Sequence, residues 1–462
     1  MMSIIPSPLH MLERARSAFD MKTIERALNL TRTGGFVPED YDVNPHTGFF
    51  PAQPLPRLPA PYTIWEDALT KAQGVLKLVE NESDEALAMR PRGEQWRETV
   101  RSWPIFGISD LSSDLRLLQR AHLVLAWIVH FYAHSIEKPN CSPLLIPRSI
   151  AMPLVAVSRE LRIAPVLTFA DTVLWNWDLI DPELPLSMDN IRYQNVFSGT
   201  DTERGFYTVS AAVELKGVEM LQIIESYMNL PNVTEPTAIV KIGRDLVALA
   251  KIVKELTEIF SSVRDAIDPE VFHWMCRPWW NGSSVKNSQP GWIYEGVPNS
   301  ASLDLAGPSA GQSSVMHALD IFLDIDHKLN QKRQPAPSET NKKAEQGFME
   351  RMRRYMPGKH REYLARVGAV PCTVREVARS MPRLQEPYNE VVAALKHLRD
   401  VHIRIACLYV VNQAHKAPPA GSGIVASDGH ADGHARGTGG NQTTILLKAG
   451  RDATQRAMLK DA

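Results

Sequence analysis

Cysteine is scarce in this sequence and follows no motif. Only four of the 462 residues are cysteines, they stand far apart, and no CxxC pair occurs among them. Zinc knuckles need paired cysteines, and disulfide-stabilised folds need many more of them. The scarcity therefore argues against both classes and favours a protein of a reducing compartment.

Net charge and long apolar runs are missing too. Lys and Arg number 51 against 52 Asp and Glu, which leaves a net charge of −1 and argues against nucleic acid or an anionic membrane as a partner. The longest apolar stretch, residues 122–133, is too short to span a bilayer, and the N-terminus lacks the basic-then-apolar order of a signal peptide. We expect a soluble cytoplasmic protein.

Alternation of strands and helices is also absent, so the sequence predicts an all-α fold. A chain of this length, 44% hydrophobic, is too long for one core. We expect a smaller N-terminal helical domain, 1–197, with a Pro-rich arm at 34–62 around its surface, and a larger C-terminal domain, 198–462, with a Gly-rich loop at 414–440. Helices are expected at 65–82, 112–134, 147–161, 168–177, 206–228, 237–267, 269–277, 310–328, 346–356, 385–412 and 443–459.

The helix expected at 385–412 carries a histidine on its apolar face. His402 shares that face with Leu398 and Ile405, and Arg399 lies one turn before it. An axial haem ligand beside an arginine that neutralises a propionate would have this arrangement. A core histidine bonded to a carbonyl is the commoner reason for such a residue, and the spacing alone leaves both interpretations open.

Ser210 is expected to point inward from the helix at 206–228, beside Phe206 and Tyr207. A lone inward serine usually donates to the carbonyl four residues earlier. The functional alternative is a small donor in an aromatic pocket. No inward acid/base pair is expected near it.

Arg277 is expected to close the helix at 269–277, just before Pro278. The helix dipole is a sufficient structural reason for a cation in a last turn. Because Trp279 and Trp280 follow and His273 shares its face, Arg277 is alternatively held among aromatic rings, where it could bind a carboxylate in two-pronged fashion.

Residues 307–311 match the G-x-S-x-G pattern of a nucleophile elbow. An elbow follows a strand, but the preceding residues are not strand-like. A helix start fits better, with Ser309 and Gln312 as a capping box and free backbone N–H groups that could meet a carboxylate or propionate. A serine hydrolase using Ser309 stays open as an alternative.

Two histidine pairs have the i, i+4 spacing of metal ligands. They are His130 with His134 and His430 with His434. No cysteine, aspartate or glutamate cluster completes either pair, so zinc is not expected at them.

Several separated motifs occur at 146–148, 169–171, 176–177, 205–207, 294–296, 309–314, 352–357 with 360–361, 398–402 and 437–440. Together and in this order they resemble the indoleamine 2,3-dioxygenase family, from about residue 30 to the C-terminus, and the long loop at 414–440 looks most like that of fungal members. The resemblance implies the two-domain helical fold of a haem dioxygenase.

The resemblance assigns roles residue by residue. His402 would bind the iron of one haem b per chain, and Arg399 would neutralise a propionate. Ser210 would lie near bound O2, Arg277 would bind the substrate carboxylate, and Thr438 on the Gly-rich loop would close over the substrate. The other implied contacts are Ser309, Ala310 and Phe206 for haem, and Phe169, Thr172, Val173, Tyr207, Phe272 and Gly439 for the substrate pocket.

The implied reaction inserts both atoms of O2 into the indole C2=C3 bond of L-tryptophan and gives N-formylkynurenine, the first step of the kynurenine pathway toward NAD. An external electron donor would reduce ferric haem, and a monomer is expected. The alternative within the family is a haem-binding or sensing protein that has lost turnover.

Three pocket positions depart from the family pattern. Phe169 stands where many members have tyrosine, Thr172 where some have cysteine, and His273 where phenylalanine is usual. These changes bear on affinity and substrate range more than on the type of reaction.

Overall fold

The computed structural model describes residues 21–30, 35–137, 142–283, 291–327, 347–425, 437–438 and 443–460. Gly439, His430 and His434, which the sequence analysis singled out, lie outside these ranges. Among the described helices, none combines the length and the apolar character needed to cross a membrane.

The described chain is mostly helical, as the sequence predicted. The helices are α2 (Met21–Leu30), α3 (Thr63–Ala72), α4 (Asp84–Ser102), α5 (Leu115–His134), α6 (Arg148–Leu161), α7 (Asp201–Met228), α8 (Pro236–Ser261), α9 (Val263–Ala266), α10 (Pro269–Val271), α11 (Arg277–Trp280), α12 (Ser314–Phe322), α13 (Phe348–Arg353), α14 (Gly358–Gly368), α15 (Val374–Ser380), α16 (Pro382–Ala406) and α17 (Thr443–Ala457). The strands are β1 (Leu144–Ile146), β2 (Trp177–Leu179), β3 (Ile191–Tyr193) and β4 (Trp292–Tyr294).

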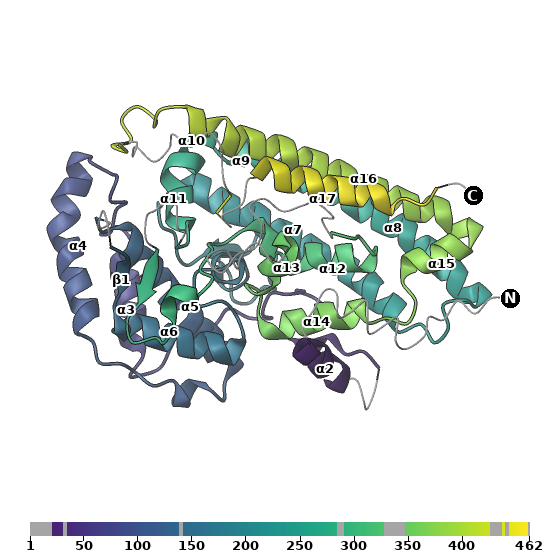
Figure 1. Ribbon diagram of the computed structural model, residues 1–462, viewed down its shortest axis with the longest axis horizontal. Coiled ribbons are helices and arrows are strands. Elements are labelled where there is room, and N and C mark those ends of the chain that lie inside the picture. The colour runs from purple at the N-terminus through teal and green to yellow at the C-terminus, as the bar shows by residue number, and fades with distance from the viewer. Residues whose placement is uncertain are drawn as a thin grey trace.

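Long helices form one half of the molecule (Figure 1). α16 packs against both α8 and α17, and α7 packs against α8 and α12. α8 presents Ala238, Ile242, Leu246 and Leu249 to this core at helical spacing, and all four are buried. α3 to α6 gather at the opposite end, around the almost wholly buried helix α5.

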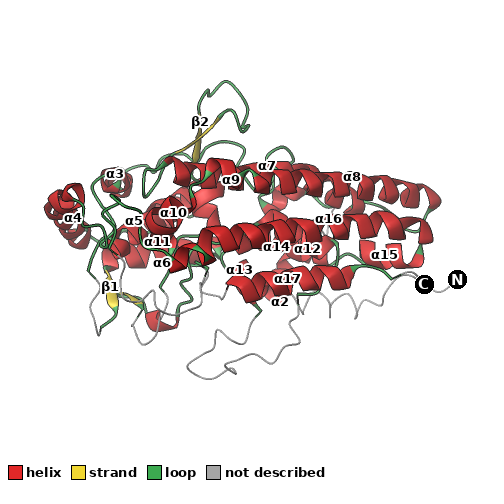
Figure 2. Cartoon of the chain, turned by 90° about the horizontal axis from the view of Figure 1, so that it is seen from above, coloured by secondary structure: helices red, strands yellow, loops and turns green. Residues whose placement is uncertain are grey.

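Short strand pairs are the sheet structure found among the described residues. β1 and β4 pair in parallel, and β2 pairs antiparallel with β3. The loop between β2 and β3 extends away from the helices (Figure 2). The three-residue β1–β4 pair is a small parallel contact that the sequence analysis did not expect, although the all-α class is confirmed.

The Pro-rich arm at 34–62 was expected to wrap the N-terminal unit, but part of it lies on α14. The ring centroids of Phe36 and Phe49 are each 5.4 Å from that of Tyr363 on α14, and the Tyr41 ring is 6.2 Å away. These aromatic contacts tie the arm to the C-terminal half of the chain. The division into domains at residue 197 stays a prediction.

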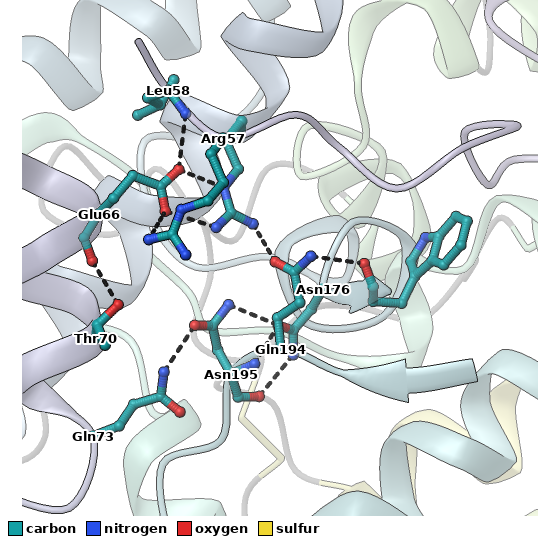
Figure 3. Close-up of polar contacts among 10 residues, drawn as sticks. Arg57, Leu58, Glu66, Thr70, Gln73, Asn176, Gln194 and Asn195 are labelled. Atoms are coloured by element: carbon teal, nitrogen blue, oxygen red, sulfur yellow. Dashed lines mark hydrogen bonds and ion pairs between the residues drawn. The ribbon is translucent and has the colours of Figure 1, made fainter. Parts of the chain in front are cut away.

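A buried polar network ties the arm to α3 and α5 (Figure 3). The Glu66 carboxylate, 3% exposed, accepts from the backbone N–H of Leu58 at 3.0 Å and pairs with Arg120 at 2.7 Å. Nearby, Gln73 donates to the side chain of Asn195, which in turn donates to Asn176. Paired and hydrogen-bonded in this way, the buried charges avoid the desolvation cost of isolated ones.

Several helix ends differ from the prediction. The helix expected at 65–82 ends at Ala72, because the chain reverses at Gly74, where φ is +81°. The helix expected at 310–328 begins only at Ser314, after one 3-10 turn, and ends at Phe322. α2, α4, α14 and α15 were not predicted.

Among the described residues, three single π-helical turns interrupt the helical segments. They cover Ala170–Leu174, Phe272–Cys276 and Cys407–Val411. The second lies between α10 and α11, so Arg277 begins α11. The sequence analysis had proposed that Arg277 closes a helix, and that prediction is wrong. π turns are rare and occur frequently at functional sites, which directs attention to the region where these three meet.

Lowering the pH from 7 to 5 is expected to destabilise the fold through His130, which is buried on α5. Burial lowers the pKa of His130 to about 4, although its hydrogen bond to the Trp279 carbonyl, 2.7 Å long, opposes this shift. In the unfolded chain a histidine titrates near pH ~6.5, so the unfolded state takes up the proton first. The stabilising contribution is therefore complete above pH ~6.5 and is lost as the pH falls toward 4.

Urea unfolding midpoints measured between pH 7 and 5 check this expectation. His130→Gln, which cannot take up a proton, should lose less stability over that range than the wild-type chain. His397→Gln provides the control, because His397 is exposed on α16. Equal losses in the wild type and His130→Gln would contradict the assignment.

Candidate functional site

A cavity of about 350 Å³ lies among α7, α8, α16 and the turn before α12. One water molecule needs roughly 10–15 Å³, so the cavity can hold a large ligand. The predicted site residues that line it are Phe169, Thr172, Phe206, Tyr207, Ser210, Phe272, Arg277, Ser309, Ala310, Arg399, His402 and Thr438. Val173 is buried but is not one of the lining residues.

His402 enters the cavity from the last turns of α16. None of the described residues hydrogen-bonds either ring nitrogen, and the ring lies 5.7 Å from that of Phe260 on α8. Burial, with a smaller contribution from Arg399, lowers the pKa of His402 to about 4. A neutral imidazole with a free nitrogen in a large apolar cavity is the form that binds a metal. The alternative of a core histidine bonded to a carbonyl does not match this geometry.

Arg399 lines the cavity one turn before His402 but is held by protein groups. Its guanidinium contacts both carboxylate oxygens of Asp320, at 2.5 and 2.7 Å, and donates to the Gly450 carbonyl of α17. Burial alone would raise the pKa of Asp320, but Arg399 and His327 hold it well below its usual range. The bond to Asp320 fixes the Arg399 guanidinium at the cavity edge. An anionic group bound at that edge would therefore meet a guanidinium whose orientation is already fixed.

Ser210 lines the cavity from α7, and its hydroxyl donates to the Phe206 carbonyl at 2.8 Å. This is the back-bond expected of a lone inward serine. One turn later comes Glu214, 1% exposed, an inward acid that the sequence analysis did not single out. Burial raises the pKa of Glu214 to about 7, against the effect of its hydrogen bond from Ser313.

Aromatic rings form one wall of the cavity. The Phe206 ring stacks on Trp280 with centroids 4.9 Å apart, and Phe272 lies 5.2 Å from Phe206 and 5.6 Å from Trp280. Tyr207 completes the wall 5.9 Å from Trp280. Flat apolar surfaces of this kind suit an aromatic ligand.

Arg277 reaches the cavity from the first residue of α11. Burial lowers its pKa to about 10, so the guanidinium remains charged at neutral pH. One of its terminal nitrogens lies 3.4 Å from Nδ1 of His273, one turn earlier. A partly buried guanidinium bordering an apolar cavity is well placed to bind a carboxylate.

The turn at 307–312 is organised by Gln312, not by the predicted capping box. Its amide donates to the Gly307 carbonyl and accepts from the backbone N–H of Phe169, at 2.9 and 2.8 Å. The Ser309 hydroxyl instead accepts from the N–H of Gly311. Gln312 therefore binds the turn to the first π turn, and Ala310 projects into the cavity between them.

Thr438 packs on the same turn. Its carbonyl accepts from the N–H of Gly307, and its hydroxyl donates to the Pro308 carbonyl. A Cβ at Gly307 would lie 1.7 Å from the Trp280 carbonyl oxygen, and one at Gly282 would lie 2.0 Å from that of Leu305. The backbones of residues 280–282 and 305–307 touch directly, and only glycine, which has no Cβ, permits so close an approach.

Other chemistries raised by the sequence find no support in the described residues. No described histidine or carboxylate hydrogen-bonds Ser309, so a hydrolase would lack its base. His130 and His134 bond to the carbonyls of Trp279 and Asn281, and no group of three potential metal ligands occurs in the described chain.

Trp280, Glu214 and Asp320 are among the cavity residues that sequence reasoning missed. Trp280 was noted only as part of the setting of Arg277. The two acids carried a weak signal, since each stands one helical turn after a residue that faces inward: Glu214 four residues after Ser210, and Asp320 three after the buried His317. Acids are usually assigned to the solvent face, which is why they were overlooked.

Comparisons with known proteins agree with this geometry. The family model described as "Indoleamine 2,3-dioxygenase" matches residues 37–457. The chain is 31% identical over 424 residues to the rat indoleamine 2,3-dioxygenase 1, an alignment that covers 91% of this chain and 95% of the rat protein. It is 28% identical to the indoleamine 2,3-dioxygenase of Saccharomyces cerevisiae, over 90% of this chain and 92% of that one. A 6-hydroxytryptophan 2,3-dioxygenase of Fusarium equiseti is also 28% identical, over 90% and 96% of the two chains.

Proposed function

This chain belongs to the indoleamine 2,3-dioxygenase family, and on that premise we propose that it inserts both atoms of O2 into the indole C2=C3 bond of L-tryptophan to give N-formylkynurenine. Members of the family are oxidoreductases that depend on haem and act on tryptophan-like indoles. The observation that carries the finer proposal is His402: a neutral imidazole, without a hydrogen bond to the described residues, in a cavity with an aromatic wall and a partly buried arginine.

The cavity fits the haem that the family implies. His402 would hold the iron, Arg399 would meet a propionate at the cavity edge, and the small side chain of Ala310 would leave room for the macrocycle. When bound, haem supplies the chemistry of O2 binding and activation. The chain has to supply binding, orientation and the exclusion of water.

The aromatic wall would receive the indole. Phe206 and Phe272 offer ring faces, and Arg277 would bind the carboxylate of the amino acid. Thr438, already bonded to the turn at Pro308, would cover the substrate and keep water out. Holding both ends of the substrate fixes which indole bond faces the oxygen, and orientation of this kind contributes strongly to rate.

Two polar groups inside the cavity, the Ser210 hydroxyl and the Glu214 carboxyl group, can donate or accept a proton. The Ser210 hydroxyl donates to the Phe206 carbonyl and can turn toward a bound ligand at the cost of that one bond. Glu214 has a pKa of about 7, so it can hold or release a proton near neutral pH. We assign no obligatory base to the reaction.

The decisive experiment reconstitutes the purified chain with haem, reduces it with an external electron donor, and supplies L-tryptophan under ¹⁸O2. N-formylkynurenine carrying two ¹⁸O atoms is expected. Turnover of 6-hydroxytryptophan alone would move the assignment toward the Fusarium relative's named substrate. A Soret band without product from either indole would favour a haem-binding protein that has lost turnover.

A further inference from the structure

Trp280 is the cavity residue whose position is fixed most completely. It is the last residue of α11, its side chain is 3% exposed, and it lines the cavity. Phe206 stacks on one side of the indole at 4.9 Å with an interplanar angle of 28°, and Phe272 meets it at 62°. Phe206 and Phe272 also contact each other, with centroids 5.2 Å apart, so Trp280 packs against a pair of rings and cannot change rotamer toward them without displacing them.

A chain of hydrogen bonds anchors the same ring in the core. Nε1 of Trp280 donates to the Tyr207 hydroxyl at 3.1 Å, and that hydroxyl donates to Glu203 at 2.8 Å. The Glu203 carboxylate, which is fully buried, also accepts from the N–H groups of Phe197 and Ser198 and from the Ser198 hydroxyl. Moving Trp280 would leave its own buried N–H without a partner, because the Tyr207 hydroxyl is its acceptor, and an unpaired buried donor is costly.

The backbone of Trp280 is fixed as well. Its carbonyl lies where a side chain at Gly307 would begin, so α11 rests directly on the turn that carries Ala310. Ring, hydrogen bonds and backbone thus hold this part of the wall in one position. A wall that cannot yield rejects a ligand that is one methyl group too large.

We propose that Trp280 sets the size limit for the aromatic part of the substrate, so that the chain discriminates against tryptophans with substituents on the six-membered ring. The inference rests on the proposed function and specifies its substrate class. Tyr207 and Glu203 act as positioning residues that keep the Trp280 ring in place. In pockets of this kind one extra methylene changes kcat/KM by roughly 10–200-fold.

The test compares L-tryptophan with its 5-, 6- and 7-methyl derivatives on the haem-loaded enzyme. In Trp280→Leu, the ratio of kcat/KM for at least one methyl derivative to that for tryptophan should rise by about tenfold or more. Trp279→Leu is the matched control, because Trp279 is equally buried but is not one of the lining residues. That control should leave the ratios at their wild-type values.

Two additions keep the test decisive. If Trp280→Leu fails to retain haem, Trp280→Phe keeps an aromatic ring and should raise the same ratio by a smaller factor. Dissociation constants measured from the Soret change of the ferric protein compare the methyl derivatives with tryptophan without turnover. A wild-type chain that binds tryptophan but makes no product would therefore refute the proposed reaction and leave the size limit at Trp280 testable by binding. Ratios within twofold of wild type for all three derivatives, in a folded haem-containing variant, would overturn the proposal.

Discussion

His402→Ala is expected to give a folded protein that no longer retains haem. Neither ring nitrogen of this imidazole is hydrogen-bonded to a described residue, so one can bind iron, and apolar contacts alone hold the macrocycle weakly. After haem addition and desalting, Soret absorbance per chain should fall by about tenfold or more. Added imidazole should restore part of it, because the substitution leaves a space of the right shape.

His397→Ala provides the control on the same helix, since His397 is exposed to solvent on α16. It should bind haem like the wild type, and far-UV circular dichroism should be unchanged in both variants. An unaltered Soret band and stoichiometry in His402→Ala would show that another residue binds the iron.

Arg277→Ala is expected to keep the Soret band and to lower kcat/KM for L-tryptophan by about 100-fold, mainly through KM. A hydrogen bond between charged groups is worth about 1.5–3 kcal/mol, and a guanidinium can make two of them to one carboxylate. Burial keeps water from compensating for the loss. Steady-state kinetics with L-tryptophan and with tryptamine, which lacks the carboxylate, separate this role from a structural one.

The two substrates should respond differently. Tryptamine kinetics should be nearly the same in the wild type and in Arg277→Ala, because the missing partner is the carboxylate. Arg204→Ala serves as the control, since Arg204 is exposed on α7 and bonds the Gly199 carbonyl. Equal losses for tryptophan and tryptamine would refute a carboxylate-binding role.

Much of this site could be predicted from local spacing. Helical periodicity correctly placed His402 and Ser210 on inward faces, and the tendency of serine to back-bond predicted the contact with Phe206. The same reasoning placed Arg277 at a helix end and paired Ser309 with Gln312. Both interpretations were wrong. A π turn places Arg277 at the start of α11, and the Gln312 side chain accepts from the backbone N–H of Phe169, 143 residues earlier in the chain, instead of capping Ser309.

The buried acids could not be predicted, for a related reason. Glu214 is stabilised by Ser313, 99 residues away, and Asp320 by Arg399, 79 residues away. Local periodicity treats a carboxylate in an amphipathic helix as solvent-facing, since nothing within a few turns offsets its desolvation. The partners become visible only in the structure, where α7 packs against α12 and where Asp320 of α12 meets Arg399 of α16.

The three π turns have a consequence for how this cavity could change. Each contributes to the lining, through Thr172, Phe272 and Tyr409, and each contains one residue more than an α-helical turn accommodates. Deleting that residue would restore regular α-helical hydrogen bonding and rotate every following side chain by about 100° relative to the preceding ones. A chain shortened at the second π turn would gain helical regularity, but Arg277, the residue that follows this turn, would rotate out of the cavity. Insertions and deletions would therefore reshape this wall more abruptly than substitutions.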